Sequence, residues 1–144
     1  PKVIEYNCRF GDPETQVVLP RLKTDIMDIF DAINHETLSD LPIEWSSDAC
    51  ACVIMASGGY PKSYPKGLEI TGLQEGQMEG VTVYHAGTAI QDGKLVTNGG
   101  RVLGVTALGD TLQDALDTAY TAVHKIQFEN AHFRTDIGKK ALNC

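Results

Sequence analysis

Three polar side chains near the amino terminus alternate along a predicted strand. Apolar and polar residues alternate over Val3–Cys8, which is the period-two pattern typical of a strand. Glu5, Asn7 and Arg9 therefore share one face, roughly 6–7 Å apart. The carboxylate and the amide oxygen suit a hard divalent cation such as Mg²⁺, which tends to sit on nucleotide phosphates. The guanidinium suits a phosphoryl or acyl-phosphate oxygen. The alternative is that this stripe is only the solvated face of the strand.

A longer pattern begins at the last of these residues. Arg9–Gln16 resembles, without interruption, the signature of the glycinamide ribonucleotide synthetase family, also called phosphoribosylamine–glycine ligases. Later blocks resemble the same family in the same order: Ala56–Pro61, His85–Thr88, Gly93–Ala107 and Phe133–Gly138. Several separate blocks in one order are more specific than one short motif.

The resemblance implies an ATP-grasp ligase of purine biosynthesis. In the implied reaction, glycine becomes an acyl phosphate at the expense of ATP. The amine of 5-phosphoribosylamine then displaces the phosphate, which gives glycinamide ribonucleotide, ADP and phosphate. By the same resemblance, Glu5 and Asn7 would hold Mg²⁺ or Mn²⁺ together with the nucleotide. From its place on the strand we infer that Arg9 neutralises charge on the transferring group.

Two further residues are candidates for binding the substrate. Asp12 lies within the signature and either caps the following helix or contacts substrate. Arg101 follows Gly99 and Gly100, which allow close backbone approach. An arginine there can reach the phosphate of 5-phosphoribosylamine, and the alternative is a surface ion pair. His85 lies on an apolar strand, and we expect it to be a core histidine with a hydrogen-bonded ring.

The residues around the signature predict a first, mainly helical region. A short helix is expected from Pro13 or Glu14 to about Leu19, where Pro20 ends or kinks it. A second helix is expected from an N-cap at residue 24 or 25 to about residue 34. Apolar residues at spacings of three and four predict a buried stripe: Leu22, Ile26, Ile29, Phe30 and Ile33.

A second region follows a linker that lacks periodicity. We expect strands at residues 49–56, 68–71, 81–85, 88–90, 94–97 and 101–108, with the first of them central. A long helix should begin at Asp110 or Thr111, with Asp114 completing a capping box. The predicted fold class is therefore α/β and α+β. Residues 1–42 form the end of an ATP-grasp core, with a strand and helices. Residues 43–144 form a small domain with a mainly antiparallel sheet and a packed helix.

Composition limits the classes of function. A net charge of −7 argues against non-specific nucleic-acid binding, which needs a basic surface. No apolar run reaches the roughly 18–20 residues of a membrane span, and no signal peptide is evident. The cysteines lack a zinc-site spacing, so we expect buried free thiols and a cytoplasmic protein: Cys8, Cys50, Cys52 and Cys144.

The start at Pro1, without Met, and the lack of a nucleotide-binding lobe suggest a C-terminal portion of a longer polypeptide. The missing N-terminal part would then be a partner of this chain, together with ATP, glycine and 5-phosphoribosylamine. The isolated chain is expected to be inactive. Two alternatives stay open: a non-catalytic metal- or ligand-binding module, and an ATP-grasp carboxylate–amine ligase with other substrates.

Overall fold

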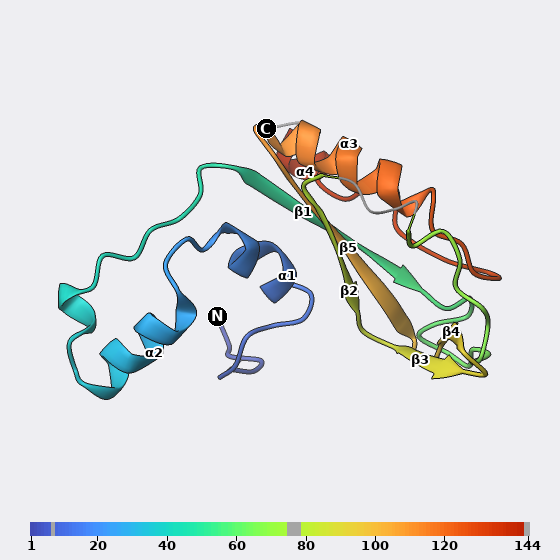
Figure 1. Ribbon diagram of the computed structural model, residues 1–144, viewed down its shortest axis with the longest axis horizontal. Coiled ribbons are helices and arrows are strands. Elements are labelled where there is room, and N and C mark those ends of the chain that lie inside the picture. Colours follow the sequence, from blue (N-terminus) through green and yellow to red (C-terminus); the bar gives the residue numbers. More distant parts are fainter. Residues whose placement is uncertain (7, 75–78, 143–144) are drawn as a thin grey trace.

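A three-stranded antiparallel sheet forms the centre of the computed structural model, which describes residues 1–6, 8–74 and 79–142 (Figure 1). Its strand order is β1 (Ala49–Ala56), β5 (Arg101–Gly109) and β2 (Val81–His85). The register places Val53 of β1 and Val83 of β2 on either side of Val105. The strand expected at residues 49–56 is confirmed, but its central position is wrong, because β5 has a partner on each side.

A hairpin lies at one end of this sheet. It consists of β3 (Thr88–Gln91) and β4 (Lys94–Thr97). Asp92 and Gly93 form the turn with φ angles of 51° and 77°, and two positive φ angles are what a two-residue hairpin turn requires. The hairpin is therefore confirmed. The strand expected at residues 68–71 is not formed, since that segment makes only isolated bridges, to Val96 and Gln127.

The helix α3 (Leu112–Val123) covers one face of the sheet, as Figure 1 shows. The expected capping box is present: the Thr111 hydroxyl accepts from the Asp114 amide at 3.2 Å, and the Asp114 carboxylate accepts from the Thr111 amide at 3.1 Å. The core between helix and sheet consists of buried apolar side chains, chiefly Val53, Met55, Val102, Leu103, Val105, Ala107, Ala119, Ala122, Val123, Ile126 and Phe128. A further short helix, α4 (Lys139–Leu142), closes the described chain.

The first region is helical, as expected. It contains α1 (Thr15–Val18), the 3₁₀ turn η1 (Leu19–Arg21), α2 (Ile26–Asn34) and the 3₁₀ turn η2 (Leu38–Asp40). The Asp25 side chain caps α2 by accepting from the Met27 amide at 2.8 Å. The predicted burial of the apolar stripe is wrong, because the buried position of α2 is Ala32 while Phe30 and Ile33 are exposed.

The described residues of the segment 3–8 do not form the strand that was expected there. Residues 3–6 and 8 have no strand assignment, and among the described residues no strand precedes β1. The physical reason is that a strand is stabilised by a paired neighbour, and the described part of the first region offers no strand to pair with. Asn7 lies outside the described residues. No described helix is long and apolar enough to cross a membrane.

Candidate functional site

An ion pair joins the signature to the sheet. The Arg101 guanidinium lies 3.0 Å from the Asp12 carboxylate and donates a second hydrogen bond, of 3.3 Å, to the Asp12 carbonyl. The two side chains remain 40% and 46% exposed. Sequence reasoning named both residues separately, and the structure brings them together. The ion pair considered as the alternative for Arg101 is thus present, with a residue of the signature as its partner.

The local structure of the signature holds Asp12 in this position. The Gln16 amide nitrogen donates to the other Asp12 carboxylate oxygen at 2.8 Å, and the Thr15 backbone donates to the Gly11 carbonyl at 3.0 Å. The first helix has Glu14 as its N-cap residue, without a side-chain cap. Asp12 therefore does not cap α1. Its carboxylate instead connects the first helix with β5.

Close packing behind Arg101 fixes the start of β5. Ser57 donates to the Gly99 and Gly100 carbonyls, from its hydroxyl and its amide, both at 2.8 Å. A Cβ atom on Gly100 would overlap the ring of Tyr60. The sequence predicted that glycines here permit a close approach, and in this structure the neighbour that approaches Gly100 is an aromatic ring.

A pocket of about 380 Å³ opens beside this ion pair, between α1 and β2. The side chains that line it come from the signature, from η1 and from the end of β2: Phe10, Asp12, Thr15, Gln16, Leu19, Tyr84 and His85. The Gln16 side-chain oxygen is buried and has no hydrogen-bond partner. An unpaired buried acceptor is costly, so a hydrogen-bond donor beside this oxygen would stabilise the site.

His85 and Tyr84 are lining residues that sequence reasoning did not assign to a site. His85 is exposed, so its prediction as a core histidine is wrong, although its ring is hydrogen-bonded as expected, to Thr88 at 3.0 Å. The physical reason is that it ends β2, an edge strand. Burial raises the pKa of Tyr84, with a smaller contribution from Cys50. Only the pairing of β2 with β5 reveals that these residues face the signature.

Glu5 and Arg9 are not gathered around this pocket in the structure. Both are exposed, and the Arg9 guanidinium donates to the neighbouring Phe10 carbonyl at 3.0 Å. The described residues contain no cluster of three His, Cys, Asp or Glu that could hold a metal. Glu5 by itself is not a metal site, because Mg²⁺ takes about six oxygen ligands. The other donors would have to come from Asn7, nucleotide phosphates, water or other protein segments.

Comparison with known proteins identifies the family. The family model for the phosphoribosylglycinamide synthetase C domain matches residues 50–140. The chain belongs to this family.

Individual members of the phosphoribosylglycinamide synthetase family match over nearly all of the chain. A phosphoribosylamine–glycine ligase of Synechocystis is 54% identical over 142 residues, which are 98% of this chain and 34% of the relative. The trifunctional purine biosynthetic protein adenosine-3 of Gallus gallus is 53% identical over 143 residues, 99% of this chain and 14% of that protein. The crystal structure of the phosphoribosylamine–glycine ligase of Thermotoga maritima matches with a TM-score of 0.73 and 37% identity. That match covers 94% of this chain and 33% of the other. The chain thus spans about a third of the length of the phosphoribosylamine–glycine ligases that it matches.

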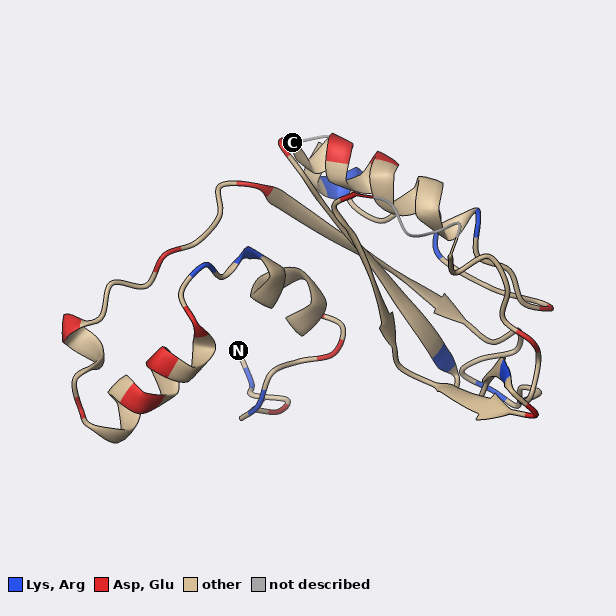
Figure 2. Ribbon diagram, in the orientation of Figure 1, with Lys and Arg blue, Asp and Glu red and all other residues tan. Residues whose placement is uncertain are grey.

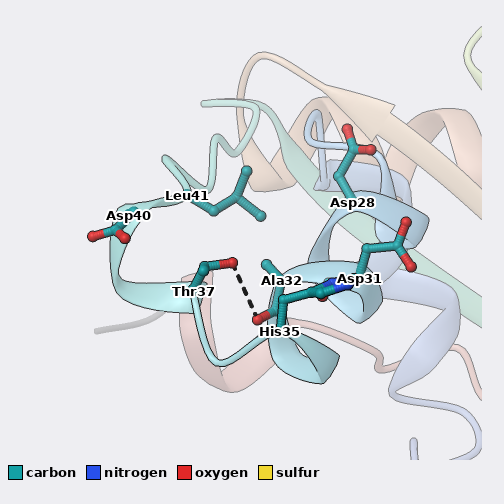
Figure 3. A pocket seen from close by; sticks show the side chains of 7 residues that line it. All are labelled: Asp28, Asp31, Ala32, His35, Thr37, Asp40 and Leu41. Carbon is teal, nitrogen blue, oxygen red and sulfur yellow. Dashed lines mark hydrogen bonds between the residues drawn. The ribbon is translucent and has the colours of Figure 1, made fainter.

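A second pocket in this chain has a volume of about 540 Å³ and is lined by several acidic side chains. It lies on the polar side of α2 (Figure 3). Asp28 and Asp31 extend from the helix, while Asp40 points away on the opposite side. At the end of α2, the His35 ring is hydrogen-bonded to the Asp31 carbonyl at 2.8 Å. The three carboxylates do not point toward one another. We therefore interpret this pocket as part of the solvated face of an amphipathic helix.

Two thiols lie on the sheet face beneath α1. Burial raises the pKa of Cys50 and of Cys52. Cys52 also raises the pKa of Cys50, whereas a hydrogen bond with Thr106 partly lowers the pKa of Cys52. Cys50 is 4.0 Å from the Gln16 carbonyl. Both are half-buried, while Cys8 is exposed. The expectation of buried thiols therefore fails for Cys8, and Cys144 lies outside the described residues.

Proposed function

We propose that this chain is part of a phosphoribosylamine–glycine ligase. The enzyme would join glycine to 5-phosphoribosylamine with ATP, giving glycinamide ribonucleotide, ADP and phosphate in purine biosynthesis. The observation that carries the proposal is a match over 98% of the chain at 54% identity to a protein of that name. The likeness to a solved ligase of the same name, with a TM-score of 0.73, supports it. A cytoplasmic location is part of the proposal.

The first residues would supply the ATP-grasp part of the site. We propose that Glu5 and Asn7 hold Mg²⁺ or Mn²⁺ with the nucleotide, and that this ion would neutralise phosphate charge. Arg9 would neutralise charge on the transferring group, since its side chain is exposed and its guanidinium donates, within the described residues, to the neighbouring Phe10 carbonyl. An arginine in such a role contributes on the order of 10³-fold or more to turnover.

Arg101 and Asp12 would bind the phosphate-bearing substrate. Arg101 is held by Asp12 in a defined orientation, and 40% of its side chain still faces solvent next to the pocket that Asp12 lines. A phosphate can share the remaining guanidinium donors, because an arginine offers five. Gln16 offers an unpaired oxygen to a donor such as an amine or hydroxyl of the same substrate.

The division into two regions is also proposed here. We infer that the first region comprises residues 1–42 and the second residues 43–144, with the boundary in the linker that precedes the sheet. The family model begins at residue 50 and the sheet at residue 49, which supports this position. Residues 44–46, just after this boundary, remain hydrogen-bonded to the first region. The Lys23 amide donates to the Glu44 carbonyl at 2.9 Å, and the Ser46 amide donates to the Arg21 carbonyl at 2.7 Å.

The test uses the native polypeptide that contains this chain. ADP formation is measured with Mg²⁺ and ATP, in the presence of glycine, 5-phosphoribosylamine, both or neither. The proposal expects ADP only with both substrates. ADP formation that needs another acid or amine would identify a ligase with different substrates. A native polypeptide that binds metal or ligand without ADP formation would be a binding module instead.

The role of Arg101 has a separate test in the same polypeptide. Arg101→Ala is expected to raise the KM for 5-phosphoribosylamine about tenfold or more, because a charge-assisted contact is lost. The KM for ATP should change much less. Equal increases in both constants would place Arg101 in a structural role only.

A further inference from the structure

A histidine at the end of β2 lines the same pocket as the signature. His85 is the last residue of β2, and together with Asp12 and Gln16 it lines the pocket of about 380 Å³. Its side chain is exposed. Histidine is the side chain that most often acts as a general base in enzymes. The roles proposed above for the other residues leave this ring without one.

The ring of His85 is anchored through one of its two nitrogens. Nδ1 lies 3.0 Å from the Thr88 hydroxyl, across the bend at Ala86 and Gly87. The amides of Ala86 and Gly87 both donate to the Val102 carbonyl at 3.0 Å, which fixes this bend on β5. When Nδ1 donates its proton to the Thr88 oxygen, Nε2 is the acceptor nitrogen of the neutral ring. Among the described residues, Nε2 has no hydrogen-bond partner.

The sheet register places His85 near the proposed phosphate site. His85 pairs with Leu103, and Arg101 lies two residues before Leu103 on β5. Such diagonal neighbours on antiparallel strands share a face and lie about 7–8 Å apart. In 5-phosphoribosylamine the ribose ring separates the phosphate from the amine. A molecule whose phosphate binds Arg101 can therefore reach His85 with its amine.

Few charged groups surround this ring. Among the described residues of the two pockets that His85 lines, the other titratable groups are Asp12 and Tyr84. Asp12 is paired with Arg101 at 3.0 Å, and burial raises the pKa of Tyr84, which keeps its phenol neutral. Arg101 is the single charged residue of β1, β2 and β5, whose ribbons are mostly tan in Figure 2. The imidazole is therefore the group of this pocket that best fits the role of proton acceptor for an amine.

We propose that His85 is the general base of the ligation step and that Thr88 positions its ring. The inference rests on the proposed function, because that function supplies the acyl phosphate of glycine and the amine. The amine nitrogen of 5-phosphoribosylamine attacks the carbonyl carbon and forms the C–N bond. The C–O bond to the phosphoryl group breaks, and its electron pair leaves with inorganic phosphate. The amine proton passes to Nε2 of His85, and the imidazolium then releases it to water.

The test compares single-turnover rates in variants of the native polypeptide that contains this chain. His85→Gln keeps a polar side chain that cannot take up a proton, and it should slow formation of glycinamide ribonucleotide on the order of 10²-fold or more. The KM for 5-phosphoribosylamine should change much less. His124→Gln is the matched control and should leave the rate unchanged, because His124 is exposed at the end of α3 and lines neither pocket.

The pH dependence distinguishes a proton acceptor from a structural residue. In the unchanged polypeptide the rate should fall toward acidic pH, because a protonated imidazole cannot accept the amine proton. This acidic fall should be absent in His85→Gln. Thr88→Val removes the hydroxyl and nearly keeps the shape, so it should slow the step less and retain the acidic fall. Added imidazole should restore part of the rate of His85→Ala, which a folding defect would not allow.

Three outcomes would overturn the proposal. The first is an unchanged single-turnover rate in His85→Gln. The second is a raised KM with an unchanged rate at saturation, which would make His85 a binding residue. The third is an acidic fall that persists in His85→Gln without rescue of His85→Ala by imidazole, which would indicate a structural role. The ADP assay of the unchanged polypeptide is read first: without ADP formation the proposed function itself fails, whereas ADP formation together with a fully active His85→Gln removes only the base.

Discussion

The two regions of this chain bury their apolar side chains to very different extents. From β1 onward, the strands and α3 enclose a core in which Val53, Val105 and Ala119 are completely buried. Ahead of β1, Ala32 is the only buried apolar side chain among the described residues. Each region has an amphipathic helix with a side-chain N-cap, α2 in the first and α3 in the second. The difference shows that a regular pattern specifies a helix face, whereas burial needs a second surface to cover it.

The largest expected effect tests this comparison directly. Leu103→Ala removes a fully buried side chain of β5 and should lower the free energy of unfolding by about 2–5 kcal/mol. Phe30→Ala, in the exposed face of α2, should lower it by less than about 0.5 kcal/mol in this chain. Urea unfolding followed by circular dichroism measures both. Similar losses for the two variants would mean that α2 is covered in solution.

The helices and the hairpin could be predicted from sequence because their signals are local. Asp25 and Thr111 mark helix starts, and Asp92-Gly93 marks a turn that only a few residue types allow. The predictions of a strand at residues 3–8 and of a central position for the strand at residues 49–56 were wrong. Strand pairing depends on segments distant in sequence, which local patterns do not reveal.

The candidate site was predicted in part for the same reason. Asp12 and Arg101 were named from the signature and from a glycine pair, but their contact spans 89 positions. Tyr84 and His85 had no sequence signal for this pocket, because only the register of β2 on β5 brings them there. The roles of Glu5, Asn7 and Arg9 remain predictions.

Thiol chemistry offers a second contrast between the regions. Cys8 is exposed, whereas burial raises the pKa of Cys50 and of Cys52. At pH 8, Cys8 should react with iodoacetamide about tenfold or more faster than the other two, because the thiolate is the reactive form. Peptide mass mapping at timed intervals distinguishes the three sites. Equal rates would show that β1 opens as readily as the amino terminus.

The same two thiols predict how stability changes with pH. The folded state favours the protonated form, so their contribution is complete below the pH at which unfolded thiols ionise, about 8.5. It is lost as the pH rises from there through the raised pKa values of the folded state. Stability of the sheet should therefore fall as the pH rises above about 8.5, and Cys50→Ser with Cys52→Ser should reduce that slope.

Matched helix caps give a smaller effect. Thr111→Ala removes the capping box of α3 and should cost about 1 kcal/mol in the cooperative unfolding of the sheet. Asp25→Ala removes the cap of α2, with a similar local cost but little change in that transition, because α2 shares few contacts with the sheet. Hydrogen exchange of the α2 amides should instead become faster. A full loss of stability with Asp25→Ala would show that the regions unfold as one unit.

The smallest effect concerns the ion pair that joins the regions. Asp12 and Arg101 are both nearly half-exposed, and exposed pairs contribute about 0.2–1 kcal/mol. Asp12→Asn should therefore change stability within this range, and raising the salt concentration should weaken the pair in the unchanged chain. A double-mutant cycle with Arg101→Gln isolates the interaction energy. A coupling well above 1 kcal/mol would mean that this pair, rather than the chain connection at residues 42–48, sets how the signature lies against the sheet. A coupling near zero would leave the guanidinium free to turn from Asp12 toward a bound phosphate at little cost, which is the behaviour that the proposed substrate role requires.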